Sequence, residues 1–352
     1  MKNDNSSTTT NEFFYDLPPE LIAQRPIRPR DEAHMYVLDR GTGKRTLNQV
    51  KDLPDFLDSG DTVVINNTKV VPTVLMGKRQ NGGQITIRLV SRKSEDVWDC
   101  AVNSPRIPQK GEVLSFGGGI IEGHVLHENQ QGTGIFVSFE SHGAPLFEAI
   151  TKLGKYFHPL HLEPLKENES EILQTVYAEP EGSFQSPSAG LHLTDELLNS
   201  FKRKDINVVE ITQHIGRLDS PELLTGDNVS KQDSLYEEWY SVSDSTADTI
   251  NETKANNHKV LAIGTTVTRT LETVAVEKNE VKSGSGWTNL FIKPGFDFKI
   301  VDHLLSNFQS PQITTLILAC AFGGTERVMD FYREAVEKKL RFLEYGDAAL
   351  YL

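Results

Sequence analysis

Two histidines lie where their side chains could exchange protons with a substrate. His192 stands between a loop of small residues, Ser188-Ala189-Gly190, and an expected helix start at Thr194, and His214 follows an expected strand at 208–212. An imidazole titrates near neutral pH, so it can act as a general acid or base in such a place. Either histidine could equally well buttress the turn that holds it. We take both as candidate catalytic residues.

A second polar group follows another expected strand, Lys259–Ile263. Gly264, Thr265 and Thr266 come next and open a helix, so backbone N–H groups and two hydroxyls could hold a carboxylate or a ribose. Arg269 lies one turn further on and could make a bidentate contact. The Gly-x-x-x-x-Gly-Lys spacing of a Walker loop is absent. A simple helix cap would use the same residues.

Two closely spaced pairs of histidines give no metal site. His124 and His127 form one pair and His158 and His161 another, but neither pair has the glutamate of a His-Glu-x-x-His motif. No third ligand is obvious for either pair. We therefore predict that no metal is bound and interpret these four histidines as surface residues.

The total charge argues against a generic polyanion binder. The chain has 352 residues, with 36 Lys+Arg against 49 Asp+Glu and a formal charge of −13. Residues 62–94, however, carry only basic charges, and a basic stripe is typical of a nucleic-acid contact. An ordinary solvated strand face would show the same pattern. The residues that we take as candidate nucleic-acid contacts are Lys69, Lys78, Arg79 and Arg88.

The pattern of elements predicts two structural units. Short strands punctuated by glycine at residues 71–144 favour a small β-barrel or sandwich. On either side, helices and strands alternate, which indicates an α/β layered domain with helices covering a mostly parallel sheet. We expect an α/β domain made of residues 12–70 and 145–352, interrupted by an inserted β-barrel. The polar residues 1–11 are expected to be a disordered tail.

Compartment signals favour a soluble cytoplasmic protein. The first residues have neither a basic nor an apolar signal region, and the longest apolar stretch, Thr315–Phe322, is too short to span a membrane. The two cysteines, Cys100 and Cys320, are far apart and are expected to be buried thiols in a reducing compartment.

Ordered segments along nearly the whole chain, from about Phe14 to the C-terminus, resemble one enzyme family. The segments include Asp16-Leu17-Pro18, Gln174-Thr175-Val176-Tyr177-Ala178, Ala189-Gly190-Leu191-His192, Gly264-Thr265-Thr266 with Arg269-Thr270-Leu271-Glu272, and Tyr345-Gly346-Asp347-Ala348. The chain resembles the S-adenosylmethionine:tRNA ribosyltransferase-isomerases of queuosine biosynthesis. The resemblance implies an α/β domain with an inserted β-barrel.

The resemblance also implies a reaction. The family transfers and isomerises the ribosyl moiety of S-adenosylmethionine onto the aminomethyl group of a 7-deazaguanine base at the tRNA wobble position. The products are epoxyqueuosine, adenine and methionine, so S-adenosylmethionine is a co-substrate and no further cofactor is implied. We expect S-adenosylmethionine and this tRNA as partners, and no membrane.

This chemistry suggests a role for each candidate. His192 and His214 would move protons, Thr265, Thr266 and Arg269 would hold the methionine carboxylate or ribose, and Gln174 and Tyr177 would line the base pocket. The other candidate substrate-binding residues are Thr175, Ala189, Gly190 and Gly264.

The chain departs from the usual family pattern at several titratable positions. Leu235-Tyr236-Glu237-Glu238 stands where the family shows Met-His-x-Glu, Gln309 stands where Asn-Phe is followed by His, and Asn67 replaces an aspartate. Two alternatives therefore stay open. One is a paralogue that uses S-adenosylmethionine with a different acceptor, and the other is a non-catalytic protein that binds tRNA or a ligand.

Overall fold

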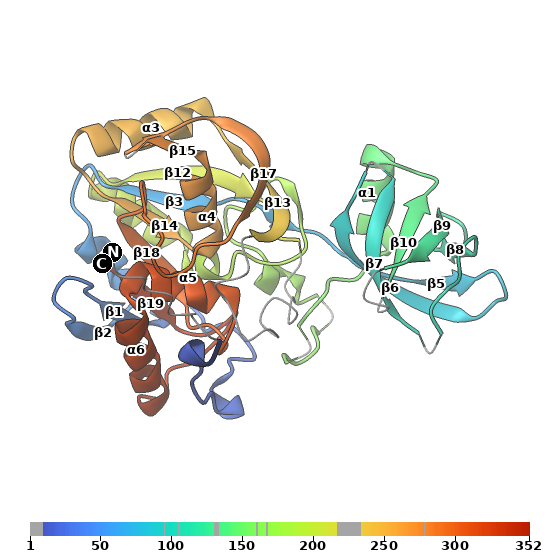
Figure 1. Cartoon of the computed structure of the whole chain (residues 1–352), viewed down its shortest axis with the longest axis horizontal. Coiled ribbons are helices and arrows are strands. Elements are labelled where there is room, and N and C mark those ends of the chain that lie inside the picture. Colours follow the sequence, from blue (N-terminus) through green and yellow to red (C-terminus); the bar gives the residue numbers. More distant parts are fainter. Residues whose placement is uncertain are drawn as a thin grey trace, which may run out of the picture.

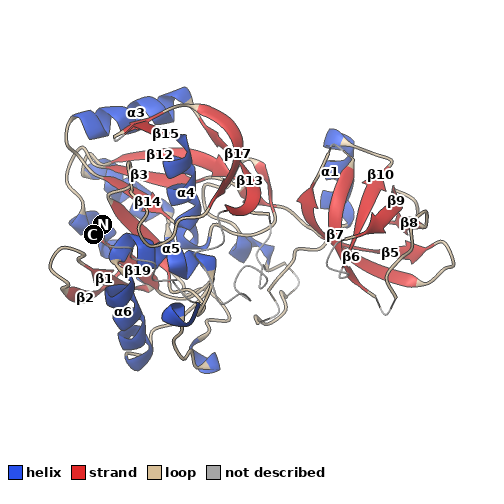
Figure 2. Cartoon of the chain, viewed as in Figure 1, coloured by secondary structure: helices blue, strands red, loops and turns tan. Residues whose placement is uncertain are grey.

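The computed structural model describes residues 10–94, 96–104, 106–129, 134–159, 161–166, 168–216, 234–277 and 279–352. The chain forms a large α/β unit with a smaller β-barrel beside it (Figure 1). Helices flank a sheet in the large unit, whereas the small unit consists almost entirely of strands (Figure 2). The predicted fold class, an α/β domain with an inserted small β-barrel, is confirmed.

The large unit is built on a mixed sheet, which has nine strands within the described residues. The strand order is β17-β13-β12-β3-β14-β18-β19-β1-β2. Its centre is parallel, because β3 pairs in parallel with both β12 and β14, and β14 pairs in parallel with β18. The bounds are β1 His34–Leu38, β2 Arg45–Gln49, β3 Thr62–Asn66, β12 Asn207–Gln213, β13 Ser234–Val242, β14 Val260–Ile263, β17 Gly284–Leu290, β18 His303–Asn307 and β19 Ala348–Tyr351.

Apolar side chains on both faces of the sheet explain the two layers of helices. In β3, Val64 packs into one core, whereas Val63 and Ile65 pack into the other. A strand buried on both faces reads as a continuous apolar run, as this one does. The first core is closed by α3 (Asp244–Ala255), α4 (Thr265–Val274), α5 (Thr314–Gly323) and α6 (Thr325–Glu337), and the second by α2 (Asp195–Arg203) and the 3₁₀ helix η4 (Val50–Phe56).

The barrel is closed by antiparallel strands in the order β10-β7-β6-β5-β8-β9. Its strands are β5 Val74–Arg79, β6 Gln84–Arg92, β7 Val97–Asn103, β8 Val113–Phe116, β9 Ile121–Glu128 and β10 Gly134–Phe139. Helix α1 (Gly143–Leu153) buries Leu146 and Ile150 in the barrel core. The barrel unit therefore continues past the expected boundary at residue 144, because these two side chains find their apolar partners in the barrel.

The start of α2 and the end of α6 have identifiable local geometry. Thr194 caps α2 as predicted, since its Oγ1 accepts a hydrogen bond from the Leu197 N–H at 3.1 Å. Helix α6 ends at Glu337, two residues before Lys339, which takes a φ of 58°. The short elements are η1 Thr10–Phe13, η2 Pro19–Leu21, η3 Arg30–Glu32, η5 Ser170–Leu173, η6 Ser188–His192, β4 Lys69–Val70, β11 Glu181–Ser183, β15 Ala275–Glu277 and β16 Glu280–Val281.

The 3₁₀ helix η1 corrects one further expectation. The predicted disordered tail ran to residue 11, but Thr10 and Asn11 belong to η1. The rest of that prediction, residues 1–9, lies outside the described residues.

Candidate active site

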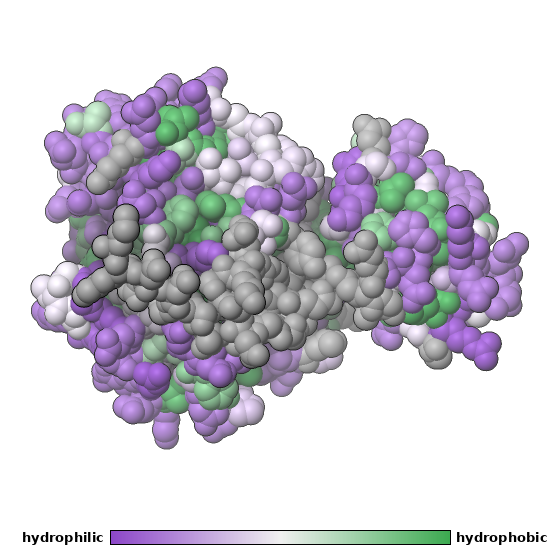
Figure 3. All heavy atoms as spheres, in the orientation of Figure 1, coloured by the Kyte–Doolittle hydropathy of each residue, from purple (hydrophilic) through white to green (hydrophobic). Residues whose placement is uncertain are grey.

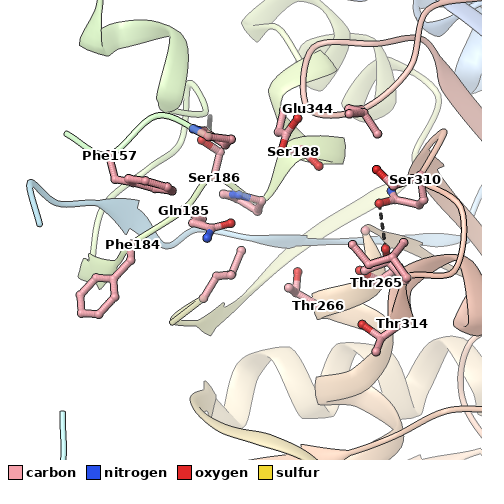
Figure 4. A pocket seen from close by; sticks show the side chains of 18 of the residues that line it. Phe157, Phe184, Gln185, Ser186, Ser188, Thr265, Thr266, Ser310, Thr314 and Glu344 are labelled. Carbon is pink, nitrogen blue, oxygen red and sulfur yellow. Dashed lines mark hydrogen bonds between the residues drawn. The ribbon is translucent and has the colours of Figure 1, made fainter. Parts of the chain in front are cut away.

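A cavity of about 1110 Å³ lies where the barrel meets the α/β unit. Strands β5, β6 and β7 contribute Val74, Arg88 and Asn103, among others, and the segment after α1 contributes Phe157. The loops of the α/β unit form the rest of the wall. In close-up, Phe157 and Phe184 lie at one end of the cavity, and Thr265, Ser310 and Thr314 lie at the other (Figure 4). The cavity thus has an aromatic end and a hydroxyl-rich end.

The hydroxyl-rich end is organised by the turn from β14 into α4. Gly264, Thr265, Thr266 and Arg269 all line the cavity, as the sequence predicted for a ligand-holding loop. Gly264 has a φ of 97°, a conformation that favours glycine over other residues. The first turn of a helix presents backbone N–H groups and the positive end of the helix dipole. This end of the cavity therefore suits a carboxylate or another oxygen-rich group.

Arg269 does not offer an open fork to a ligand. Its Nη1 lies 2.5 Å from Glu238 Oε2, and its Nε donates to the Leu290 carbonyl at 3.1 Å. Its Nη2 donates to the Thr288 carbonyl at 3.4 Å. In this structure the guanidinium is thus bound to a carboxylate of the chain itself, and the expected bidentate contact between Arg269 and a substrate carboxylate stays a prediction.

Glu238 is a member of the cavity wall that we did not single out from the sequence. Gln213 Nε2 donates to its Oε2 at 2.7 Å, and the Gly216 N–H donates to its Oε1 at 3.1 Å. Thr270 Oγ1 in turn donates to Gln213 Oε1 at 2.6 Å. Because both carboxylate oxygens are bonded and the charge faces Arg269, this network fixes the wall rather than supplying a free base.

His192 lies behind the cavity wall. Its Nε2 is 3.2 Å from Asn307 Oδ1, and the side chain borders a separate small pocket instead of the large cavity. Burial lowers the pKa of His192 to about 4, so the ring is neutral at physiological pH. In this structure His192 joins η6 to β18, while its neighbours Ser188 and Ala189 line the cavity.

His214 is also packed within the wall. Its Nδ1 is 2.8 Å from Thr68 Oγ1, and its ring stacks on Trp239 with centroids 5.0 Å apart. Burial lowers its pKa to about 4. The following residue, Ile215, lines the cavity, but His214 does not. The expectation that these two histidines reach a substrate in the cavity is therefore not supported by their positions.

The expected base-pocket residues brace the cavity from outside. The Gln174 side chain bonds both the N–H and the carbonyl of Val70, at 3.0 and 2.8 Å. Tyr177 donates to the Gly190 carbonyl at 3.4 Å, and Thr175 is buried beside them. None of the predicted residues Gln174, Thr175, Tyr177 and Gly190 lines the cavity. Within the loop 188–190, Ala189 is the predicted residue that lines the cavity.

The four candidate nucleic-acid contacts have different environments. Arg79 donates to both carboxylate oxygens of Glu112, at 2.6 and 2.7 Å, so its side chain is used within the barrel. Lys69 forms an ion pair with Glu181 at 2.9 Å. Lys78 is exposed on β5. Arg88 lines the cavity with its guanidinium 4.2 Å from the centre of the Phe157 ring.

Glu181 and Glu112, which pair with Lys69 and Arg79, lie outside residues 62–94. The sequence of residues 62–94 alone therefore shows basic residues without their acidic partners.

A second pair that the sequence did not single out lies at the cavity. His161 lines it, and its Nε2 is 3.0 Å from Oε2 of Glu344, which lines it too. The hydrogen bond that the His161 ring donates to the Glu344 carboxylate raises the pKa of His161. Sequence reasoning treated His161 as a surface residue, and its side chain is indeed 40% exposed, but part of that surface faces the cavity. No signal in the sequence joins two residues so far apart.

The described residues contain no group of three or more His, Cys, Asp or Glu side chains placed to hold a metal ion. Among the same residues, no helix has both the length and the apolar character that crossing a bilayer requires. On the face shown in Figure 3, hydrophilic residues cover much of both units.

Comparison with known proteins gives consistent matches. The profile of a family described as "Queuosine biosynthesis protein" matches residues 10–351. Proteins from two strains of Clostridium kluyveri, both named S-adenosylmethionine:tRNA ribosyltransferase-isomerase, are 40% identical to this chain over 338 residues, which cover 96% of this chain and 98% of each relative.

A solved structure matches as well. The crystal structure of S-adenosylmethionine tRNA ribosyltransferase from Thermotoga maritima is 31% identical, with a TM-score of 0.56, and the match covers 97% of this chain and all of that one. Because the profile and the relatives both span nearly the whole chain, this protein belongs to the queuosine biosynthesis protein family.

Proposed function

We propose that this protein is an S-adenosylmethionine:tRNA ribosyltransferase-isomerase. It transfers the ribosyl moiety of S-adenosylmethionine to the aminomethyl group of a 7-deazaguanine base at the tRNA wobble position and isomerises it. Epoxyqueuosine, adenine and methionine are the products, S-adenosylmethionine is the co-substrate, and no further cofactor takes part. Membership of the family and the 40% identity to relatives with this name support the proposal.

The observation that carries the proposal is the cavity shared by the two units. Ligand pockets usually measure about 300–1,000 Å³, so a space of about 1110 Å³ is large for one small molecule. It suits two reactants, a nucleoside-sized co-substrate and the target base of a larger molecule. Such a space also brings the reacting groups together, which is a main source of rate in a transfer between two substrates.

The two ends of the cavity suit different parts of the reactants. The hydroxyls of Thr265 and Thr266 and the helix start at Gly264 favour the methionine carboxylate or the ribose oxygens. At the other end, Phe157 and Phe184 offer aromatic faces to a base, and Arg88 adds a positive charge. We therefore place S-adenosylmethionine toward α4 and the tRNA base toward the barrel.

Lys78 lies on the barrel strand β5, where an exposed ammonium can meet a tRNA phosphate. With tRNA as the acceptor, the reaction takes place in the cytoplasm.

The test uses the full-length protein. We expect incubation with S-adenosylmethionine and tRNA that carries the aminomethyl base to release adenine and methionine in a one-to-one ratio with epoxyqueuosine in the digested tRNA. The matched control is the same tRNA with guanine at the wobble position, which lacks the amine and should give no modified nucleoside. Adenine release without tRNA modification would instead indicate another acceptor. Binding of both substrates without turnover would indicate a non-catalytic protein.

A further inference from the structure

His161 is in a position to meet a substrate. It is the one histidine among the described residues that line the cavity. Its side chain is 40% exposed, so a ligand in the cavity can reach it without any rearrangement of the core. The Nε2 atom lies 3.0 Å from Glu344 Oε2, which holds the ring in place. An imidazole oriented by a carboxylate is a common arrangement for proton transfer.

Two other polar side chains of the cavity wall, Glu238 and Gln309, are used within the chain. Glu238 is bound to Arg269 and to two N–H donors. Gln309, at the position where the family usually carries a histidine, donates to the Asn307 carbonyl at 2.9 Å and accepts from Thr315 at 2.8 Å. An amide does not titrate, so Gln309 cannot take over proton transfer.

Charged and titratable groups lie around the segment that carries His161. Glu344 comes from the loop before β19, and His158 lies in the same segment as His161, with its Nε2 3.1 Å from Tyr345 Oη. Arg25 acts electrostatically on His158 and is paired with Glu169 at 3.1 Å. The contact with Glu344 raises the pKa of His161, so a larger fraction of the ring is protonated near neutral pH.

We propose that His161 is the general acid that protonates the departing adenine, and that Glu344 is its positioning residue. This rests on the proposed function. In the step, the bond between ribosyl C1′ and adenine N9 breaks and its electron pair goes to the base. An oxygen on C1′ supplies the electron pair that forms the new C–O π bond. The imidazolium proton of His161 passes to a ring nitrogen of adenine, so neutral adenine leaves and His161 becomes neutral.

The first test is His161→Gln, assayed by single-turnover release of adenine with saturating S-adenosylmethionine and the aminomethyl tRNA. General acid catalysis contributes about 100-fold or more, so we expect at least that loss in rate. The Kd for S-adenosylmethionine should change less than about threefold, because the proton is needed only as the bond breaks. The matched control is His124→Gln, which removes a histidine that is 3.1 Å from Glu140 on the barrel, away from the cavity.

The second test is the pH profile of Glu344→Gln. A general acid must be protonated, so the wild-type rate should fall as pH rises through the pKa of His161. Removing the carboxylate that raises this pKa should move the fall in rate to lower pH. A merely structural role for Glu344 would lower the rate equally at every pH and would overturn this assignment.

The two proposals fail in different ways. If the wild-type protein releases no adenine, the proposed function is wrong and the role of His161 falls with it. If the wild-type protein is active and His161→Gln keeps a rate within about threefold of it, only the role of His161 is overturned. A loss of S-adenosylmethionine affinity as large as the loss of rate would also overturn it, since His161 would then be a binding residue.

Discussion

Glu238 and Arg269 face each other at 2.5 Å across the junction of β13 and α4, with side chains only 9% and 11% exposed. The pair joins the antiparallel side of the sheet to the helix whose first turn borders the cavity. Its charges cancel within the wall, so the hydroxyl-rich end is neutral apart from the helix dipole. The pair therefore shapes the site through position rather than through charge.

The pair gives a prediction about stability. Replacing Glu238 by Gln leaves the Arg269 guanidinium buried without its carboxylate, and breaking a buried pair in this way costs about 3 kcal/mol. We expect that loss in the free energy of unfolding, measured by urea denaturation of the full-length protein. Glu237→Gln is the matched control, because Glu237 is exposed on the same strand and should change stability by less than about 0.5 kcal/mol. Equal effects of the two variants would contradict the structural role of the pair.

The buried histidine His192 gives a prediction about pH. Its pKa in the folded protein is about 4, below the ordinary value of 6.5, because burial disfavours the imidazolium. Between these values the unfolded chain binds more protons than the folded one, so the free energy of unfolding falls as pH is lowered from 6.5 to 4. The slope for one proton is at most about 1.4 kcal/mol per pH unit.

The test of this slope is a comparison with His192→Gln. The variant lacks the titrating ring, so its free energy of unfolding should depend less on pH between 6.5 and 4 than that of the wild-type protein. Urea denaturation at a series of pH values measures both. Parallel pH dependences in the two proteins would show that His192 is not held neutral by the fold.

The fold could be predicted well because its signals are local. The run Thr62–Ile65 is buried on both faces, and Thr194 followed by two acids marks the start of α2. Glycine-punctuated short strands were enough to indicate the barrel. The end of α6 carries no such local signal, because Lys339, not a glycine, takes the left-handed conformation there, which residue type alone does not reveal.

The site could be predicted only in part because its contacts are long-range. The turn Gly264–Thr266 lines the cavity. It could be recognised from the sequence because its loop and the start of α4 are continuous along the chain. Arg269, in contrast, meets Glu238 31 residues away, and His161 meets Glu344 183 residues away. Whether a titratable side chain faces a cavity or a partner depends on such encounters, and this is why His192 and His214 looked more exposed to substrate than they are.

The basic residues of the barrel give a prediction about tRNA. Arg88 lines the cavity, so Arg88→Ala should weaken tRNA binding and reduce the slope of log K against log salt by about 1, as expected for the loss of a phosphate contact. Arg79→Ala should leave both quantities nearly unchanged and instead lower stability by about 1 kcal/mol, because Arg79 is bound to Glu112. Filter binding over a range of salt concentrations and urea denaturation separate the two effects. If Arg79→Ala reduced the salt slope and Arg88→Ala did not, Arg79 would leave Glu112 to contact the nucleic acid.

A last prediction concerns the loop that carries Ala189 into the cavity. A Cβ added at Gly190 would lie 2.3 Å from the Tyr177 hydroxyl, far inside contact distance. Gly190→Ala should therefore lower the free energy of unfolding by about 2 kcal/mol, as overpacking does. It should also reduce activity, because the loop must move.

The clash can be relieved from the other side, which tests its cause. Tyr177→Phe removes the hydroxyl and with it only a long 3.4 Å hydrogen bond to the Gly190 carbonyl, so alone it should cost less than about 1 kcal/mol. In the double variant the nearest remaining atom would be Thr175 Cγ2 at 3.2 Å, which a small shift accommodates. The double variant should hence be more stable than Gly190→Ala, a coupling that a double-mutant cycle measures directly. Strictly additive effects would mean that the tyrosine hydroxyl is not what makes Gly190 necessary.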